Sequence, residues 1–266
     1  MIDTHTHLDG EEFIEDIDQV VSRAKDAGVS HVMVPGINRK SCQTVMALCS
    51  MFHDYAYPML GLHPEDVDRD WEKQLKEIRL FIDESIKHGD DAPETPRIIG
   101  IGEVGLDYYW SREYEDEQLS AFEKQVEWSI ELQLPLMIHC RKAQNEMVHL
   151  LRQYEKELPG GVFHCFTGNA REAEELLRFE RFALGIGGVL TFKKSHLPEV
   201  LPEVVPLNRI VLETDSPYMA PVPHRGKRNE SSFVAVVCEK LAECYSTTPQ
   251  EISSITDSNV KRIFKI

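Results

Sequence analysis

The chain has 266 residues, with 29 Lys and Arg against 45 Asp and Glu, and its formal net charge is −16. Hydrophobic residues make up 42% of the sequence, which is enough to build a folded core and argues against intrinsic disorder. The acidic balance argues against a protein that coats nucleic acid nonspecifically, because phosphate binding depends on Lys and Arg. It leaves open an enzyme that handles nucleic acid locally.

No stretch approaches the ~18 consecutive apolar residues of a membrane span, and Met1 leads into charged and His residues rather than into a signal segment. The six cysteines contain no CxxC pair. We therefore expect a cytoplasmic monomer with reduced thiols, without a disulfide and without a membrane partner.

Short apolar runs alternate with segments of helical periodicity, a pattern typical of repeated βα units around a parallel sheet. The predicted strands are residues 1–2, 31–34, 56–62, 98–101, 135–139, 161–165, 182–186 and 210–212. The predicted helices are residues 15–27, 41–52, 70–87, 115–132, 144–158, 171–179, 195–204 and 233–245. Eight strand and helix pairs in this length predict an α/β fold of the (β/α)₈ TIM barrel type, in one domain over residues 1–266. Residues 87–95 are interpreted as a surface loop.

Histidines and carboxylates follow several of these strands. His5 and His7 come after the first strand at a spacing that places both imidazoles on one side, where they can share a metal ion. Two surface histidines would give the same pattern. Four further candidates lie at the carboxyl ends of later strands, where the catalytic groups of a barrel converge; they are Glu103, His139, His164 and Asp215. Each alone could be a buried polar residue or a helix cap, but their recurrence favours a site.

Four histidines and two carboxylates exceed the three protein ligands typical of one catalytic zinc ion. The set therefore predicts two divalent metal ions, and Glu103, whose two carboxylate oxygens can span both ions, is the expected bridge. Imidazole ligands favour zinc or manganese, whereas carboxylates and phosphate favour magnesium, so the metal stays open. Cys140 and Cys165 follow ligand histidines, and strand alternation is expected to turn them away from the metals.

The motifs that carry these residues resemble the TatD family of metal-dependent DNases in the amidohydrolase superfamily. They are DTHTHLD at 3–9, GLHP at 61–64, GEVGLDYY at 102–109, IHCRKA at 138–143, HCFTG at 164–168 and ETDSPYMAPVPHRGKRNE at 213–230. The resemblance covers the chain from Asp3 to the SNVKRIF near its end. It implies a (β/α)₈ barrel, one or two divalent cations and hydrolysis of DNA phosphodiester bonds, often from the 3′ end. By motif, it implies that His5, His7, Glu103, His139, His164 and Asp215 are the metal ligands.

Several other residues are candidates for contact with the substrate. His63 can bind a phosphate or brace the loop at Pro64, and Arg141 can contact a phosphate or pair with a carboxylate such as Glu213. His224, Arg225, Lys227 and Arg228 form a concentrated basic patch in an acidic chain, from which Arg225 and Lys227 are the chosen phosphate contacts. Tyr108, Tyr109 and Trp110 can stack an unpaired base or pack under helices.

The sequence is compatible with three functions. The first is a metal-dependent 3′–5′ exonuclease acting on single-stranded or frayed DNA ends, with RNA as a further substrate class, in which Asp215 accepts a proton. The second is hydrolysis of an amide or aminoacyl ester at the same centre. The third is a catalytically silent binding module, which the presence of all six ligand residues disfavours.

Overall fold

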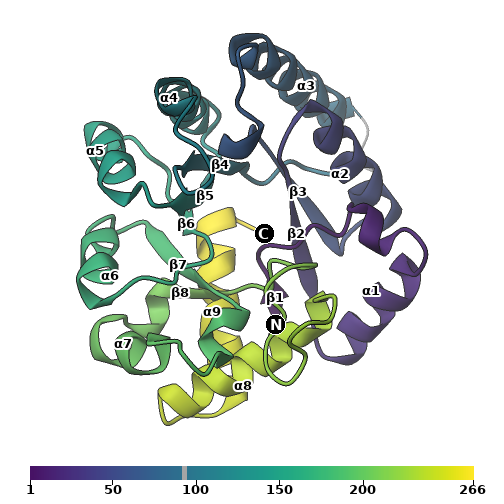
Figure 1. Ribbon diagram of the computed structural model, residues 1–266. Coiled ribbons are helices and arrows are strands. Elements are labelled where there is room, and N and C mark those ends of the chain that lie inside the picture. Colours follow the sequence, from purple (N-terminus) through teal and green to yellow (C-terminus); the bar gives the residue numbers. More distant parts are fainter. Residues whose placement is uncertain (92–94) are drawn as a thin grey trace. The chain divides into compact units, whose positions relative to one another are not determined.

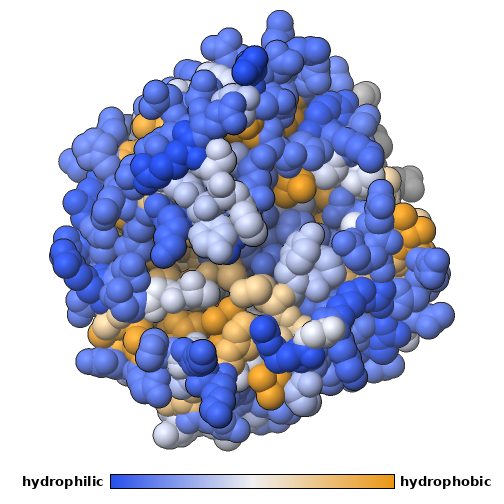
Figure 2. Space-filling model, viewed as in Figure 1, coloured by the Kyte–Doolittle hydropathy of each residue, from blue (hydrophilic) through white to orange (hydrophobic). Residues whose placement is uncertain are grey.

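The computed structural model describes residues 1–91 and 95–266. The chain forms two compact units, one made of Met1–Val34 with Phe163–Ile266 and the other of Pro35–Val162. In both, parallel strands alternate with helices (Figure 1). The face seen in Figure 2 is covered mostly by hydrophilic residues. Within the described residues, no helix has the length and apolar composition needed to cross a bilayer.

The first unit carries both chain termini. Its strands are β1 (Ile2–Asp3), most of β2 (His31–Gly36), β7 (Phe182–Ile186) and β8 (Ile210–Leu212), and its helices are α1 (Ile17–Asp26), α6 (Ala170–Leu177), α7 (Leu197–Val204), α8 (Val234–Cys244) and α9 (Pro249–Phe264). β1 pairs in parallel with β2, and β7 pairs in parallel with β8. A parallel bridge between Thr6 and Ser216 joins the segment after β1 to the segment after β8. The carboxyl ends of β1 and β8 therefore lie together.

The second unit has the same alternation. Its strands are β3 (Ala56–Leu60), β4 (Ile101–Asp107), β5 (Leu136–Arg141) and the start of β6 (Gly161–Phe163), and its helices are α2 (Arg39–Met51), α3 (Trp71–Asp91), α4 (Glu115–Leu132) and α5 (Gln144–Tyr154). β4 pairs in parallel with β5, so that Gly105 faces His139, and a Met59–Gly100 bridge joins β3 to the entry of β4. Figure 1 shows α4 covering β4 and β5, with α3 and α5 beside it.

β4 corrects the sequence-based prediction most. The expected strand covered 98–101, whereas the observed one is Ile101–Asp107, and all seven of its residues are buried. Its glycines and carboxylates were interpreted as a loop because a half-buried strand is expected to alternate apolar and polar residues. Glu103 consequently lies inside the strand. In α3, helix extends through Asp91 where a loop was expected, and residues 92–94 of that predicted loop lie outside the described residues.

The helix α9 was missed by the prediction. Its start carries a recognisable signal, because Pro249 occupies the first turn and the Thr248 side chain accepts a hydrogen bond from Glu251 N at 3.2 Å. Ile252, Val260 and Phe264 form its buried stripe. The signal therefore lay in the capping residues.

The buried face of α4 includes polar residues. Phe122 and Val126 are buried, and Gln118 and Gln125 are buried with them. The Gln125 amide accepts from Leu62 N at 2.7 Å and donates to Leu62 O at 3.1 Å. Gln118 makes the same pair of contacts with Asp107, at 2.9 and 3.1 Å. Each glutamine thus pairs with both backbone groups of a residue at or just beyond the end of a strand.

Buried asparagines do the same in the first unit. Asn229 Nδ2 donates to Thr214 O at 2.8 Å and Tyr218 O at 2.6 Å, and Asn259 Nδ2 donates to Leu207 O and Ile210 O at 2.9 and 2.8 Å. The backbone on either side of β8 is therefore fixed by amide side chains from later in the chain.

Gln125→Leu removes both contacts with Leu62 while keeping the volume of the side chain. We expect the free energy of unfolding to fall by about 2–5 kcal/mol, because two buried backbone groups are left without a partner. Urea denaturation measures this. Gln153→Leu, at an exposed position of α5, is the control, with an expected change below about 0.5 kcal/mol. An equal loss of unfolding free energy in the two variants would contradict a stabilising role for the hydrogen bonds between Gln125 and Leu62.

Candidate metal and catalytic centre

The first unit brings four of the predicted ligands together. The Nε2 atoms of His5 and His7 are 3.3 Å apart, and Asp215 Oδ1 lies 3.9 Å from the first and 3.7 Å from the second. The ring of His164 stacks on His5 with centroids 3.7 Å apart. Asp215 N donates to His5 O at 2.9 Å, so backbone pairing holds the carboxylate beside the imidazoles.

The distance between the two imidazole nitrogens fits a divalent cation, and the Asp215 oxygen lies somewhat farther from each, at 3.7–3.9 Å. Two ligand atoms that each lie 2.0–2.1 Å from a tetrahedral metal are separated by about 3.3–3.4 Å. A hydrogen bond between the two imidazoles would explain their short distance by itself. The Asp215 oxygen lies near both nitrogens, however, and the three atoms form a group that could hold a metal ion. Two nitrogens and one oxygen are a donor set that zinc and manganese accept.

Glu213 was not chosen as a site residue, although it lies beside His164. Its fully buried Oε1 is 3.1 Å from His164 Nδ1 and accepts a hydrogen bond from Cys165 N at 2.7 Å. A carboxylate on one ring nitrogen commonly orients a histidine whose other nitrogen binds a metal. Within the first unit, Glu213 thus lies against His164. The position of Glu213, two residues before Asp215, was the signal available in the sequence.

The expectation for Cys165 is wrong. Its sulfur and the ligand atoms of His164 and Asp215 all lie within 4.8 Å of one another. β6 ends at Phe163, and Cys165 has a φ of 49°, so the alternation of a regular strand does not apply to it. This cysteine therefore belongs to the ligand group.

The Asp215 carboxylate is ionised more readily than an ordinary aspartate. Burial raises its pKa, but the hydrogen bond from His7 and the charges of His164, His5 and His7 outweigh burial and lower it. The residue has a φ of 57°, a conformation in which Asp is enriched. A carboxylate with a low pKa at this position remains charged at neutral pH.

The second unit also contains imidazoles and carboxylates in contact with one another. Glu103 Oε1 lies 2.9 Å from His139 Nδ1 and 3.4 Å from His63 Nε2, and His139 Nε2 lies 2.9 Å from Asp107 Oδ2. A neutral imidazole has one N–H donor, so two carboxylates at this distance need the doubly protonated ring, or one contact must give way to a cation. Glu103, His63 and His139 form a three-ligand group in this unit.

Asp107 is the second residue that sequence reasoning missed. Burial raises its pKa, but the hydrogen bonds from His139 and from Tyr109 N outweigh it, and the net shift is downward. Glu103, Gly105 and Asp107 alternate along β4, and this period was hidden when the strand was ended at residue 101. A longer strand would have predicted both carboxylates on one face.

β5 continues to Arg141, as the prediction for that residue required. The Arg141 guanidinium lies over the ring of Tyr109 at 3.6 Å from its centroid. His63 is buried; its Nδ1 accepts from Glu65 N at 3.1 Å, so a neutral ring carries its hydrogen on Nε2. That nitrogen is the one that faces Glu103.

The residues of the basic patch at 224–228 make different contacts. Arg225 stacks on Phe192 at 3.7 Å from the ring centroid, and His224 stacks on Phe233 at 4.0 Å. Arg225 and Lys227 stay predicted phosphate contacts.

Arg228 is used structurally. It donates to both carboxylate oxygens of Asp16, at 2.8 and 2.7 Å. Nearby, Arg23 pairs with the buried Glu230 at 2.7 Å and also contacts Asp16. Four charged groups thus hold α1 against the loop after β8.

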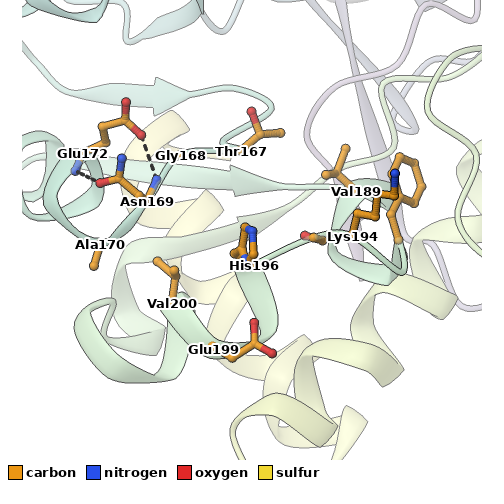
Figure 3. Close-up of a pocket in the computed structure, with 12 residues that line it drawn as sticks. Thr167, Gly168, Asn169, Ala170, Glu172, Val189, Lys194, His196, Glu199 and Val200 are labelled. Atoms are coloured by element: carbon orange, nitrogen blue, oxygen red, sulfur yellow. Dashed lines mark hydrogen bonds between the residues drawn. The ribbon is translucent and has the colours of Figure 1, made fainter.

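A pocket of about 770 Å³ opens in the first unit between the loops that follow β6 and β7. Figure 3 shows Asn169 and Glu172 on one side and Lys194, His196 and Glu199 on the other. Asn169 and Glu172 cap α6 reciprocally, at 2.8 and 3.1 Å, so their polar atoms are used within the loop. The first residue that lines the pocket, Thr167, follows His164 by three residues in the chain.

Glu230→Gln tests the charged cluster by its pH dependence. Burial raises the pKa of Glu230, but the hydrogen bonds from Arg23 and Ser232 outweigh it and lower the pKa. Its stabilisation is therefore complete above the unfolded pKa of about 4.3 and is lost as the pH falls through the lower folded value. We expect the variant to lose about 1–3 kcal/mol of unfolding free energy at pH 7.

Denaturation of wild type and variant between pH 7 and pH 3 measures the difference, which should shrink on acidification. Glu239→Gln, an exposed position of α8, is the control and should show a small, flat difference. If the difference in unfolding free energy between wild type and Glu230→Gln grew at low pH, the pKa of Glu230 would not be lowered in the folded protein.

The chain is similar to known proteins over its whole length. The sequence profile described as TatD related DNase matches residues 2–265. A Bacillus subtilis protein named uncharacterized metal-dependent hydrolase YabD is 37% identical over 266 residues, covering 100% of this chain and 99% of its own. A Pectobacterium parmentieri protein named 3′-5′ ssDNA/RNA exonuclease TatD is 33% identical over 272 residues, covering 100% of both chains.

Solved structures agree. The crystal structure of YjjV, a TatD homologue from Escherichia coli K12, superposes with a TM-score of 0.87 at 26% identity, over 100% of this chain and 98% of that one. A TatD family hydrolase from Entamoeba histolytica has a TM-score of 0.81 at 22% identity, over 99% and 97% of the two chains, and supports the fold alone. The (β/α)₈ fold class is confirmed, whereas the single domain and the six-residue ligand set stay predictions. The chain belongs to the family of TatD related DNases.

Proposed function

We propose that this protein is a metal-dependent phosphodiesterase that removes nucleotides from the 3′ ends of single-stranded or frayed DNA, with RNA as a further substrate class. Family membership gives the coarser activity of a metal-dependent hydrolase. The observation that carries the proposal is the group formed by His5, His7 and Asp215, whose ligand atoms lie 3.3–3.9 Å apart. The name of the P. parmentieri relative supports the substrate class and the polarity.

The residues proposed to hold the metal are His5, His7, Glu103, His139, His164 and Asp215. Bound divalent cations supply a water of lowered pKa and neutralise charge on phosphoryl oxygens. Six protein ligands exceed the need of one catalytic cation, so two cations would be held, with Glu103 among the residues that hold them. Magnesium, manganese and zinc are the candidates.

Asp215 is proposed as the proton acceptor. Its lowered pKa keeps the carboxylate charged at neutral pH, and its Oδ1 faces the imidazoles of His5 and His7. The other oxygen, Oδ2, remains to receive a proton from the attacking water. Backbone pairing with His5 fixes the carboxylate before substrate binds, which lowers the reorganisation needed during the reaction.

His63 and Arg141 are proposed to neutralise the phosphate. Because Nδ1 of His63 accepts from Glu65 N, Nε2 carries the hydrogen of the neutral ring and can donate to a phosphoryl oxygen in place of its 3.4 Å contact with Glu103. Arg141 stacks its planar face on Tyr109, which leaves the N–H edge of the guanidinium for a bidentate phosphate contact. Arg225 and Lys227 are proposed to contact phosphates farther along the strand.

Asp215→Asn should retain most metal binding but lose about 10²–10⁴-fold in kcat, because an amide keeps one oxygen ligand and cannot accept a proton. Metal content by mass spectrometry and hydrolysis of an end-labelled oligonucleotide are the two measurements. Asp18→Asn, an exposed carboxylate on α1, is the control. Recovery of the wild-type rate by excess metal would overturn the proton-acceptor role.

Chelator-stripped protein should lose hydrolysis of oligonucleotides and regain it with one or more of magnesium, manganese and zinc. Strands labelled at the 5′ end should shorten progressively, whereas closed circular single strands should survive. An oligoribonucleotide tests the further substrate class, and an aminoacyl ester tests the alternative reaction. Efficient cutting of circles would exclude an exonuclease, and no phosphodiester hydrolysis with any metal would exclude the proposed activity.

A further inference from the structure

An exposed aromatic cluster lies at the end of β4. Tyr109 is 48% exposed and Trp110 is 69% exposed, and their rings meet edge to face with centroids 4.8 Å apart. The Arg141 guanidinium lies 3.6 Å above the Tyr109 ring and 5.4 Å from the centroid of Trp110. We call Tyr109, Trp110 and Arg141 the aromatic platform.

The aromatic residue just before these two is packed differently. Tyr108, the preceding residue, is 6% exposed and has Arg112 above its ring at 4.8 Å. The same segment thus buries one aromatic side chain and leaves two in water, although burying a large apolar side chain stabilises a fold by roughly 1.5–3 kcal/mol. Exposed rings gathered at one place are typical of a binding surface.

The platform is preorganised. Tyr109 N donates to Asp107 Oδ1 at 2.8 Å, and Tyr108 N donates to Arg141 O at 2.9 Å, so the backbone of Tyr109 and of the residue before it is held by β4 and β5. A preformed surface loses little conformational entropy when a ligand binds. The arginine restricts the tyrosine ring further through its cation–π contact.

The platform is also joined to the proposed site. Asp107, which holds Tyr109 N, lies 2.9 Å from His139 Nε2, and Arg141 follows His139 by two residues on the same strand. A ligand stacked on these rings would therefore lie close to the strand that carries His139, a proposed metal ligand, and Arg141, a proposed phosphate contact.

We propose that the aromatic platform stacks an unpaired nucleobase of the substrate strand, with Arg141 contacting the adjoining phosphate. This inference rests on the proposed function and adds the residues that hold an unpaired base of the strand. Stacking accepts every base because each has a π face, so the platform binds without sequence preference. It also gives an acidic protein affinity for nucleic acid that depends less on Lys and Arg, and hence less on salt.

The test uses a short thymidine strand with a phosphorothioate 3′ linkage, which resists cleavage, and an abasic strand with the same number of phosphates. Anisotropy of a 5′ fluorophore measures the affinity of wild type and of the Tyr109→Leu, Trp110→Leu double variant. We expect the double variant to lose about five-fold or more in affinity for the thymidine strand and clearly less for the abasic strand. Equal losses for the two strands, or no loss for either, would overturn the platform.

Intrinsic fluorescence gives a second measurement. The thymidine strand should quench part of the tryptophan emission of wild type, and Trp110→Phe should lose this quenching while binding with similar affinity. Trp128→Phe is the matched control, because Trp128 also has an arginine near its ring, Arg79 at 5.9 Å, but is only 8% exposed. Quenching that persists in Trp110→Phe would contradict stacking on this ring.

These results are separable from the proposed function. Cleavage of unmodified strands by metal-loaded wild type tests hydrolysis and does not depend on how the base is held. Hydrolysis with no difference between thymidine and abasic strands leaves the phosphodiesterase and removes the platform. Binding without hydrolysis at any metal would remove the phosphodiesterase and leave a strand-binding surface.

Discussion

Buried amide side chains that hold the backbone at strand ends are the interaction on which the site depends. Where a parallel strand stops, its N–H and C=O groups lose their ladder partners while still being buried, and each unsatisfied group costs about 1–3 kcal/mol. Gln125 supplies the missing partners for Leu62, next to His63, and Gln118 supplies them for Asp107. Asn229 does this for Thr214, next to Asp215. The chain can therefore leave its regular strands without losing the placement of its chemical groups.

The groups so placed are imidazoles and carboxylates in contact with one another. Glu103 and Asp107 both lie 2.9 Å from nitrogens of His139, and Glu213 lies 3.1 Å from His164. Burial alone would neutralise such carboxylates, but hydrogen bonds and neighbouring positive charge keep the pKa of Asp107 and of Asp215 low. Asp3, fully buried and bonded mainly to neutral groups, shows the opposite balance, with its pKa raised to about 7. Partner identity, more than depth, decides the charge of each carboxylate.

Regular periodicity was a reliable guide where the environment of an element is simple. The helix at 115–132 and the strands at 182–186 and 210–212 have the predicted bounds, because an amphipathic helix and fully buried apolar strands leave clear patterns. β4 broke this rule. Its buried face is built from glycine and carboxylate residues that are stable there only because His139, Gln118 and backbone groups from elsewhere satisfy them. α9 was missed because its signal lies in Thr248 and Pro249 rather than in a strong apolar stripe.

The sequence by itself determined the alternation of strands and helices up to α8, the family, and which histidines lie in or just after strands, since periodicity and motif spacing are properties of the linear chain. Tertiary structure decided which neighbours those residues have. It placed Asp107 on His139, Glu213 on His164 and Cys165 among the ligands, and it used Arg228 to hold Asp16. It also buried Tyr108 while leaving Tyr109 and Trp110 exposed. These outcomes depend on groups far apart in sequence competing for burial and hydrogen bonds, and no local pattern records the result of that competition.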